Sequence, residues 1–228
     1  MNRLLAALCC IALASGACAG AGSARAGDSG AEPGTDGGWR LAVGVFAGAL
    51  AVDQRLENYR WDTRPAMQTG VQATVYHGRF AAGARLWGSR TTQAIGIPGT
   101  GESPRVNLTG VEGVGRVRLF DISRVELWGS GHAGRIHLGY SPDRLTFDTG
   151  ALADPITVAF DPIAEWEFGF GAGLRGEVTE HLAVSLDAER SSFALDTAHR
   201  RGEEIVESRD WFHSWSLRLQ VSWLLTLG

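Results

Sequence analysis

The sequence of 228 residues contains no lysine, because all 21 of its basic residues are arginines. The acidic residues number 25, which gives a formal net charge of −4 at pH 7. An acidic chain with scattered arginines lacks the basic patch that binds nucleic acid, so we expect no nucleic-acid partner. A hydrophobic content of 44% and a charged content of 20%, with no glycine triplet repeat, exclude a disordered chain and a collagen.

Cysteine is absent after position 18, since the three cysteines are Cys9, Cys10 and Cys18. These positions fall inside a predicted signal peptide, residues 1–26. Arg3 gives its positive start, Leu4 to Ala14 form its apolar stretch, and Ala24-Arg25-Ala26 provides a small-x-small cleavage site. The mature protein therefore has no disulfide and no cysteine-ligated metal. A retained anchor and a lipoprotein signal acylated at Cys18 are the alternatives.

Long hydrophobic runs are also absent from the predicted mature chain. Residues 27–38 form a polar linker without periodicity, which we expect to be disordered. The longest apolar stretch beyond it, Leu41 to Val52, has about 12 residues, whereas a membrane-spanning helix needs roughly 17–25. The sequence therefore excludes a helical transmembrane topology.

Alternation of apolar and polar residues with a period of two recurs along the chain and indicates β-strands. It is clearest near the C-terminus, where Trp211, Trp215, Leu219 and Trp223 share one face. Such strands exceed the five or six residues usual in soluble sheets, and they are long enough to cross a membrane when tilted. Eight strands are predicted, at residues 39–50, 67–77, 80–91, 106–120, 124–140, 163–178, 182–193 and 209–227.

The predicted connections alternate between tight and long. Tight turns are expected at Gly78-Arg79, Asp121-Ile122-Ser123 and Thr179-Glu180-His181. The long connections are polar and lie near 51–66, 92–105, 141–162 and 194–208. Long loops at one end and tight turns at the other are typical of membrane barrels. The sequence therefore predicts an all-β fold, an eight-stranded antiparallel up-and-down transmembrane β-barrel over residues 39–228.

The charged strand residues fall on the face opposite leucine, valine and tryptophan. A soluble ligand-binding barrel has the reverse arrangement, so this pattern favours lipid as the outer solvent. Charges inside a narrow barrel must be paired, because an unpaired buried charge is strongly unfavourable. The predicted lumen charge network comprises Arg85, Glu112, Arg118, Glu126, Glu165, Glu167, Arg175, Asp187, Glu189 and Arg218.

The turn positions predict which of these residues face each other across neighbouring strands. Glycines opposite Asp187 and Glu189 would leave room for these two bulky acids. The predicted pairs are Gln72 with Arg85, Arg118 with Glu126, Glu112 with His132, Arg175 with Ser185, Gly173 with Asp187 and Gly171 with Glu189.

Aromatic residues gather near the predicted strand ends. Amphipathic rings prefer the headgroup level of a membrane, so we interpret them as membrane-interface side chains. A surface for stacking sugars is the alternative. The predicted interface aromatics are Trp39, Trp87, Tyr140, Trp211, Trp215 and Trp223.

Signal peptide, alternating strands, tight turns and long outer loops together resemble the small eight-stranded bacterial outer-membrane barrels, the OmpA-transmembrane-domain and OmpX kind. The resemblance covers about residues 39–227 and rests on pattern rather than on a motif. One departure is the C-terminus, Trp223-Leu-Leu-Thr-Leu-Gly228, which lacks the usual terminal aromatic. The resemblance implies a Gram-negative outer-membrane location, with membrane lipids, lipopolysaccharide and the outer-membrane assembly machinery as partners.

An eight-stranded barrel has an interior just wide enough to be filled by side chains, so no wide pore is expected. We therefore predict a structural or surface-interaction role carried by the outer loops, whose ligand the sequence does not name. No cofactor site, metal site or catalytic site is predicted, and the six histidines lack metal-site spacing.

Two alternatives for function stay open, a narrow channel and a lipid A deacylase-like hydrolase. The hydrolase needs a serine activated by a histidine on the same strand face, as in His-x-Ser. The corresponding stretch reads Glu189-Arg190-Ser191 and contains no histidine, while His213 and Ser214 are adjacent and point apart.

A folded membrane barrel keeps its shape in SDS until it is boiled. We expect the protein in the membrane fraction to migrate differently before and after boiling. Identical migration, together with recovery from the soluble periplasmic fraction, would overturn the membrane assignment.

Overall fold

The computed structural model describes residues 38–96, 101–147, 155–201 and 204–227. The predicted signal peptide, residues 1–26, and all but the last residue of the predicted linker, 27–38, lie outside the described residues. In the part of the chain that is described, no helix is long and apolar enough to cross a membrane.

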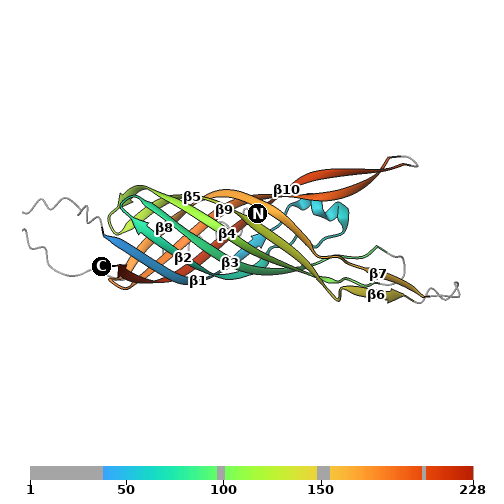
Figure 1. Cartoon of the computed structure of the whole chain (residues 1–228), viewed down its shortest axis with the longest axis horizontal. Coiled ribbons are helices and arrows are strands. Elements are labelled where there is room, and N and C mark those ends of the chain that lie inside the picture. Colours follow the sequence, from blue (N-terminus) through green and yellow to red (C-terminus); the bar gives the residue numbers. More distant parts are fainter. Residues whose placement is uncertain (1–37, 97–100, 148–154, 202–203, 228) are drawn as a thin grey trace, which may run out of the picture. The chain divides into compact units, whose positions relative to one another are not determined.

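Eight antiparallel strands close into a ring in the order β1-β10-β9-β8-β5-β4-β3-β2 (Figure 1). The ring closes between the first and last strands, where Trp39 lies opposite Leu227 and Ala51 opposite Trp215. The predicted fold class is thus confirmed. The strands of the ring are β1 (Trp39–Ala51), β2 (Ala66–His77), β3 (Phe80–Thr92), β4 (Arg105–Ile122), β5 (Val125–Ser141), β8 (Ile163–Thr179), β9 (Leu182–Arg201) and β10 (Glu204–Leu227).

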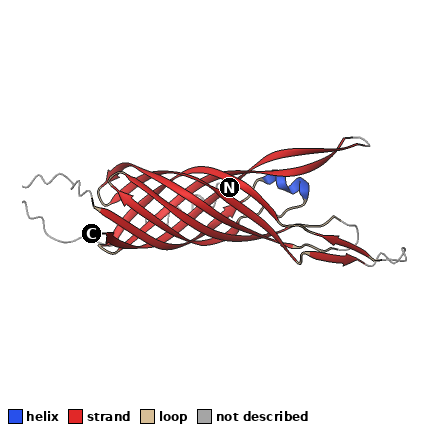
Figure 2. Cartoon of the chain, viewed as in Figure 1, coloured by secondary structure: helices blue, strands red, loops and turns tan. Residues whose placement is uncertain are grey.

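Three further elements lie in the long connections, at the end of the barrel away from the tight turns (Figures 1 and 2). A 3-10 helix, η1 (Gln54–Tyr59), follows β1, and a two-stranded hairpin, β6 (Arg144–Phe147) and β7 (Ile156–Ala159), joins β5 to β8. The expected loop at 194–208 is instead a continuation of β9 and β10, which stay paired up to Arg201 and Glu204. We call this end the outer end and the tight-turn end the inner end.

The tight turns set the register of the strand pairs. Gly78 has a φ of 56°, in the left-handed region that a glycine-first hairpin turn requires. Gln72 lies opposite Arg85, as predicted. The predicted pairs across β8 and β9 are present too, with Arg175 opposite Ser185, Gly173 opposite Asp187 and Gly171 opposite Glu189.

The predicted register of β4 and β5 is wrong by two residues. The turn is centred on Ser123-Arg124, and an irregularity lies between Arg118 and Phe120. Glu112 therefore lies opposite Gly134 rather than His132. A shift of two residues keeps every side chain on its predicted face, so the inward set of β4 and β5 is unchanged.

The outward surface of the ring is apolar, as an environment of lipid requires. Exposed leucines, valines and aromatic rings cover it from Val45 on β1 to Leu225 on β10, and on β9 the outward apolar side chains are partly exposed. The lumen, by contrast, is layered. Its middle holds buried charges, whereas its outer part is an apolar cluster capped by Leu56 of η1, which the alternation had not predicted. The cluster also contains Phe46, Leu50, Leu108, Ile136, Leu138, Phe193 and Phe212.

Glycines on the inner face make room for the largest lumen side chains. A Cβ on Gly171 would lie 2.5 Å from Cγ of Glu189, and one on Gly173 would lie 2.0 Å from Oδ1 of Asp187. A Cβ on Gly110 would lie 2.0 Å from the indole nitrogen of Trp87. The high glycine content therefore fills a steric need of this narrow lumen.

Gly171→Ala should destabilise the barrel by about 1–3 kcal/mol, because the added methyl meets both the Glu189 side chain and the backbone oxygen of Ala188. Urea unfolding followed by tryptophan fluorescence measures the change. The matched control is Gly115→Ala on the outward face of β4, where an added Cβ has nothing within 4 Å. Equal stability of both variants would contradict the steric role of Gly171.

Candidate functional site

The centre of the lumen is an ion-pair network around Arg85 of β3. Its guanidinium donates from Nε to Glu112 at 2.9 Å and from Nη2 to Glu189 at 2.9 Å. Arg218 of β10 also pairs with Glu189. All four side chains are buried, with at most 4% of each exposed. The predicted residues Arg85, Glu112, Glu189 and Arg218 thus meet in one network, contributed by β3, β4, β9 and β10.

Asp187, another predicted lumen acid, is neutralised by a residue that the sequence reading missed. Nη2 of Arg116 donates to Asp187 at 3.0 Å, and both side chains are buried. Arg116 lies four residues after Glu112 on the same strand and therefore faces the same way. The alternation of side chains along this strand was therefore sufficient to predict that Arg116 faces the lumen.

A second network lies nearer the inner end. Arg175 donates to Glu126 at 2.7 Å and to Glu177 at 3.1 Å, and Arg118 donates to Glu126 at 3.1 Å. Arg40 completes it through Glu177 at 2.8 Å. The Arg118–Glu126 contact survives the register difference because long side chains reach diagonal neighbours.

Glu165 does not join the lumen network. It faces inward on β8 but lies near the outer end, where its carboxylate accepts a hydrogen bond from the half-exposed Arg209 at 2.5 Å. Parity predicted its direction, whereas its height along the strand decides its partner. Glu167, two residues further along, lies in the central lumen and is 2% exposed.

Four predicted interface aromatics point outward. Trp39, Trp211, Trp215 and Trp223 are between 52% and 58% exposed, as side chains in contact with lipid would be. Their positions differ in height, since Trp39 and Trp223 lie toward the inner end and the other two toward the outer end.

The assignment of Trp87 and Tyr140 to the membrane interface is wrong. Trp87 is 5% exposed and donates its indole N–H to Glu112 in the lumen. Tyr140 faces inward on β5, packs against the apolar cluster and stacks on Phe160. Position near a strand end did not decide the face of these two rings.

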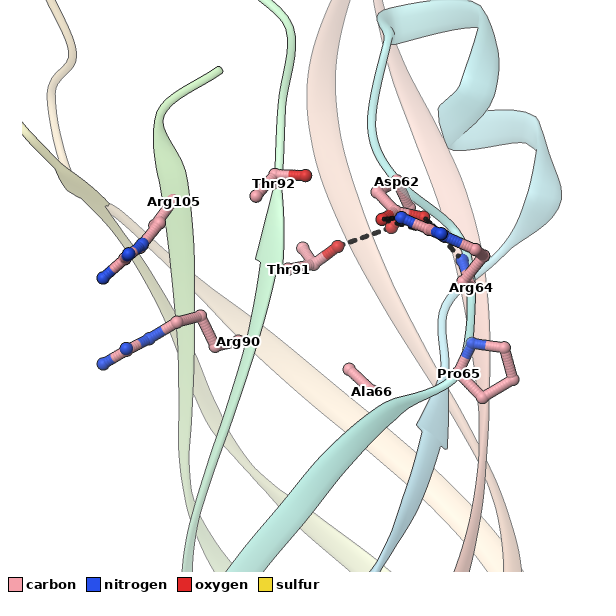
Figure 3. A pocket seen from close by; sticks show the side chains of 8 residues that line it. All are labelled: Asp62, Arg64, Pro65, Ala66, Arg90, Thr91, Thr92 and Arg105. Carbon is pink, nitrogen blue, oxygen red and sulfur yellow. Dashed lines mark hydrogen bonds and ion pairs between the residues drawn. The ribbon is translucent and has the colours of Figure 1, made fainter.

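An open cavity of about 440 Å³ lies at the outer rim between residues 62–65, which follow η1, and the ends of strands β2 to β4 (Figure 3). Arg90 and Arg105 extend from β3 and β4 on one side of it, and Arg64 lies across from them. Arg64 is neutralised by Asp62, whose pKa it holds below the ordinary value through a hydrogen bond. Arg90 donates from Nε to Asn107 at 2.8 Å. Among the described residues, neither Arg90 nor Arg105 has an acidic partner.

Asp53, the N-cap residue of η1, connects this helix to β10 at the outer rim. Burial raises the pKa of Asp53, but hydrogen bonds from Arg55 and from the backbone N–H of His213 outweigh it and lower the pKa to about 2. Asp53 is thus ionised and fixes η1 against β10, because His213 donates to it at 3.0 Å.

Two adjacent serines of β9 contact histidines on opposite faces of the strand. Ser191 faces inward, and its Oγ lies 2.9 Å from Nε2 of His132, whose Nδ1 lies 3.2 Å from Glu189. Ser192 faces outward, and its Oγ lies 2.8 Å from Nδ1 of His213. The inward set is buried, so a substrate carbonyl has no approach to it. In the described chain no carboxylate hydrogen-bonds the His213 ring.

Removing one partner from the central network should be costly, because it leaves a buried guanidinium uncompensated. Glu189→Gln is expected to lower the free energy of unfolding by about 3–5 kcal/mol, measured by urea titration in detergent. The control Glu180→Gln makes the same chemical change at a carboxylate that is 85% exposed and should have little effect. A Glu189 variant as stable as this control would refute the network's role.

Neither the protein-family models nor the curated proteins contain a match to this chain. Solved structures do match. Neisserial surface protein A has 10% identity and a TM-score of 0.50, covering 81% of this chain and 96% of its own. The outer-membrane protein AlkL has 14% identity and a TM-score of 0.51, covering 90% and 98%. At such identities the likeness concerns the fold, and by its fold the chain is a small eight-stranded β-barrel of the outer-membrane type.

Proposed function

We propose that the protein is a non-enzymatic barrel of the Gram-negative outer membrane whose outer rim binds the phosphate groups of lipopolysaccharide. The observation that carries this proposal is the pair Arg90 and Arg105 beside the rim cavity, without an acidic partner among the described residues. Both face outward, on the same strand faces as the apolar residues Leu86 and Val111 but nearer the outer end. They therefore lie where the headgroups of an outer leaflet would be.

The chemistry of the site fits a phosphate. Guanidinium groups bind phosphate with two parallel hydrogen bonds, and two neighbouring arginines offset its charge without competition from a carboxylate. The side-chain oxygen of Asn107 accepts a hydrogen bond from Nε of Arg90. This bond orients the guanidinium and leaves its terminal nitrogens to donate to a ligand. Two more outward arginines lie over indole rings, Arg135 over Trp166 at 4.7 Å and Arg190 over Trp215 at 5.6 Å. The face of each indole ring offsets part of the guanidinium charge.

The double variant Arg90→Gln/Arg105→Gln should lose at least about tenfold in affinity for lipopolysaccharide, since a charge-assisted hydrogen bond contributes roughly 1.5–3 kcal/mol. Binding is measured by native-gel shift of the purified barrel. The control Arg79→Gln/Arg124→Gln removes the same charge from two exposed inner turns. Dephosphorylated lipopolysaccharide should bind the wild type as weakly as intact lipopolysaccharide binds the variant.

Two results would contradict the proposal. One is equal lipopolysaccharide binding by the rim variant and the inner-turn control. The other is equal binding of phosphorylated and dephosphorylated lipopolysaccharide by the wild type. Competition by millimolar inorganic phosphate would place the recognition in the phosphate alone rather than in the lipid.

A second candidate function, ester hydrolysis of membrane lipids, is favoured by the outward contact of Ser192 with His213. Serine nucleophiles need such a base, but they also need a group that orients the histidine. The rim proposal expects membranes containing the wild-type protein to show no deacylated lipid by mass spectrometry. A product that disappears in Ser192→Ala and persists in Ser214→Ala, whose serine faces the lumen, would establish the hydrolase instead.

A further inference from the structure

Three donor side chains meet in the central lumen in a way that ion pairing does not explain. Glu112, His132 and Glu167 come from the neighbouring strands β4, β5 and β8, and one donor atom of each lies within 4.8 Å of the other two. At most 6% of each residue is exposed. Carboxylate oxygens and imidazole nitrogens are donors that divalent transition ions, zinc above all, accept in proteins.

Glycines bring these three residues together. Gly134 of β5 lies opposite both Glu112 and Glu167, so no side chain separates the two carboxylates. A Cβ on Gly134 would lie 2.8 Å from Cγ of Glu112. Gly169 lies opposite His132 and leaves space for its ring, because a Cβ there would lie 2.4 Å from two of its atoms.

Glu167 is the buried lumen acid that lacks a cation. Glu112 and Glu189 pair with Arg85, and Asp187 pairs with Arg116. No ion pair joins Glu167 to another described residue, and its Oε2 is buried without a hydrogen-bond partner. An ionised carboxylate in this setting is strongly unfavourable unless a positive charge reaches it.

His132 has a carboxylate near one ring nitrogen and a serine on the other, and its Nδ1 makes no hydrogen bond within the described residues. Its Nδ1 lies 3.2 Å from Oε2 of Glu189, while its Nε2 points to the side of Ser191, 2.9 Å away. Metal-binding histidines characteristically hold a carboxylate on the ring nitrogen that does not bind the metal. An ion at Nε2 would replace its contact with Ser191, and Nδ1 would then serve as the nitrogen that donates toward Glu189.

We propose that Glu112, His132 and Glu167 bind one Zn²⁺ ion in the lumen and thereby join strands β4, β5 and β8. Zinc bonds of about 2.0–2.2 Å need donor atoms roughly 3.3 Å apart, so the three side chains close inward by small rotations. Glu189 lies beside His132, Arg85 donates to Oε2 of Glu112, and Trp87 donates to its Oε1, so Glu112 would bind the ion while keeping these donors. The ion is a structural component independent of the rim site.

The experiment refolds the full barrel from urea into detergent with EDTA, with Zn²⁺ or with Mg²⁺, and measures retained metal by mass spectrometry after desalting. We expect one Zn²⁺ per barrel, no retained Mg²⁺ and a higher unfolding temperature with zinc. Wild-type protein that retains no stoichiometric Zn²⁺ overturns the proposal. Lipopolysaccharide binding at the rim should be the same with and without zinc, which separates this test from the one above.

Variants locate the site. Glu167→Gln and His132→Asn should each reduce zinc affinity at least tenfold, whereas Asp187→Asn, which neutralises a buried lumen acid outside the cluster, should keep it. Heat-modifiable mobility in SDS gels identifies folded barrels, and only these are compared. Retention of zinc by folded Glu167→Gln protein at the wild-type level contradicts the assignment.

A proton is the alternative occupant of Glu167. Infrared spectroscopy detects it as a protonated-carboxyl band that disappears in Glu167→Gln. The proposal expects this band to vanish when the wild type is refolded with zinc. A band that persists in zinc-refolded protein shows that a proton holds the position, and the zinc site is then wrong.

Discussion

A ring of eight strands encloses a space that only side chains can fill, and the charged ones among them must be neutralised there. The structure meets this constraint around Arg85 and Glu189, where strands on opposite sides of the ring are joined through the lumen. The placement of the inner-face glycines follows from accommodating these groups. Glycines lie beside the bulkiest acids, and an apolar cluster covers the ionic layer on its outer side.

Much of this arrangement could be predicted from the sequence. The period-two pattern gave the closed antiparallel ring, and the tight turns gave the register of β2 with β3 and of β8 with β9. The register of β4 and β5 was predicted wrongly, but by an even number of residues. The prediction of which of their side chains face the lumen was therefore still correct.

Other features depend on height along a strand, which alternation does not encode. Glu165 and Glu167 share a parity, yet one reaches Arg209 at the outer end and the other lies in the central lumen. Trp87, by contrast, shares the inward face of Arg85, so alternation does give its direction, and Gly110 and the carboxylate of Glu112 explain its place in the lumen. That Arg90 and Arg105 lie near each other at the rim follows only from the register of β3 with β4, in which Arg90 lies opposite Asn107.

The continuation of β9 and β10 beyond the ring has a consequence for the surface of the protein. Past Phe193 on β9 and Trp215 on β10, these strands pair only with each other, so no further strand lies along the outer borders of their described residues, although Asp53 binds the backbone N–H of His213 on the β10 side. Such borders readily recruit a strand from another chain. Here Asp196 and Arg209 form a charged rung across the projecting ribbon at 3.2 Å. Charges of this kind discourage pairing of the ribbon with the sheet edges of other chains.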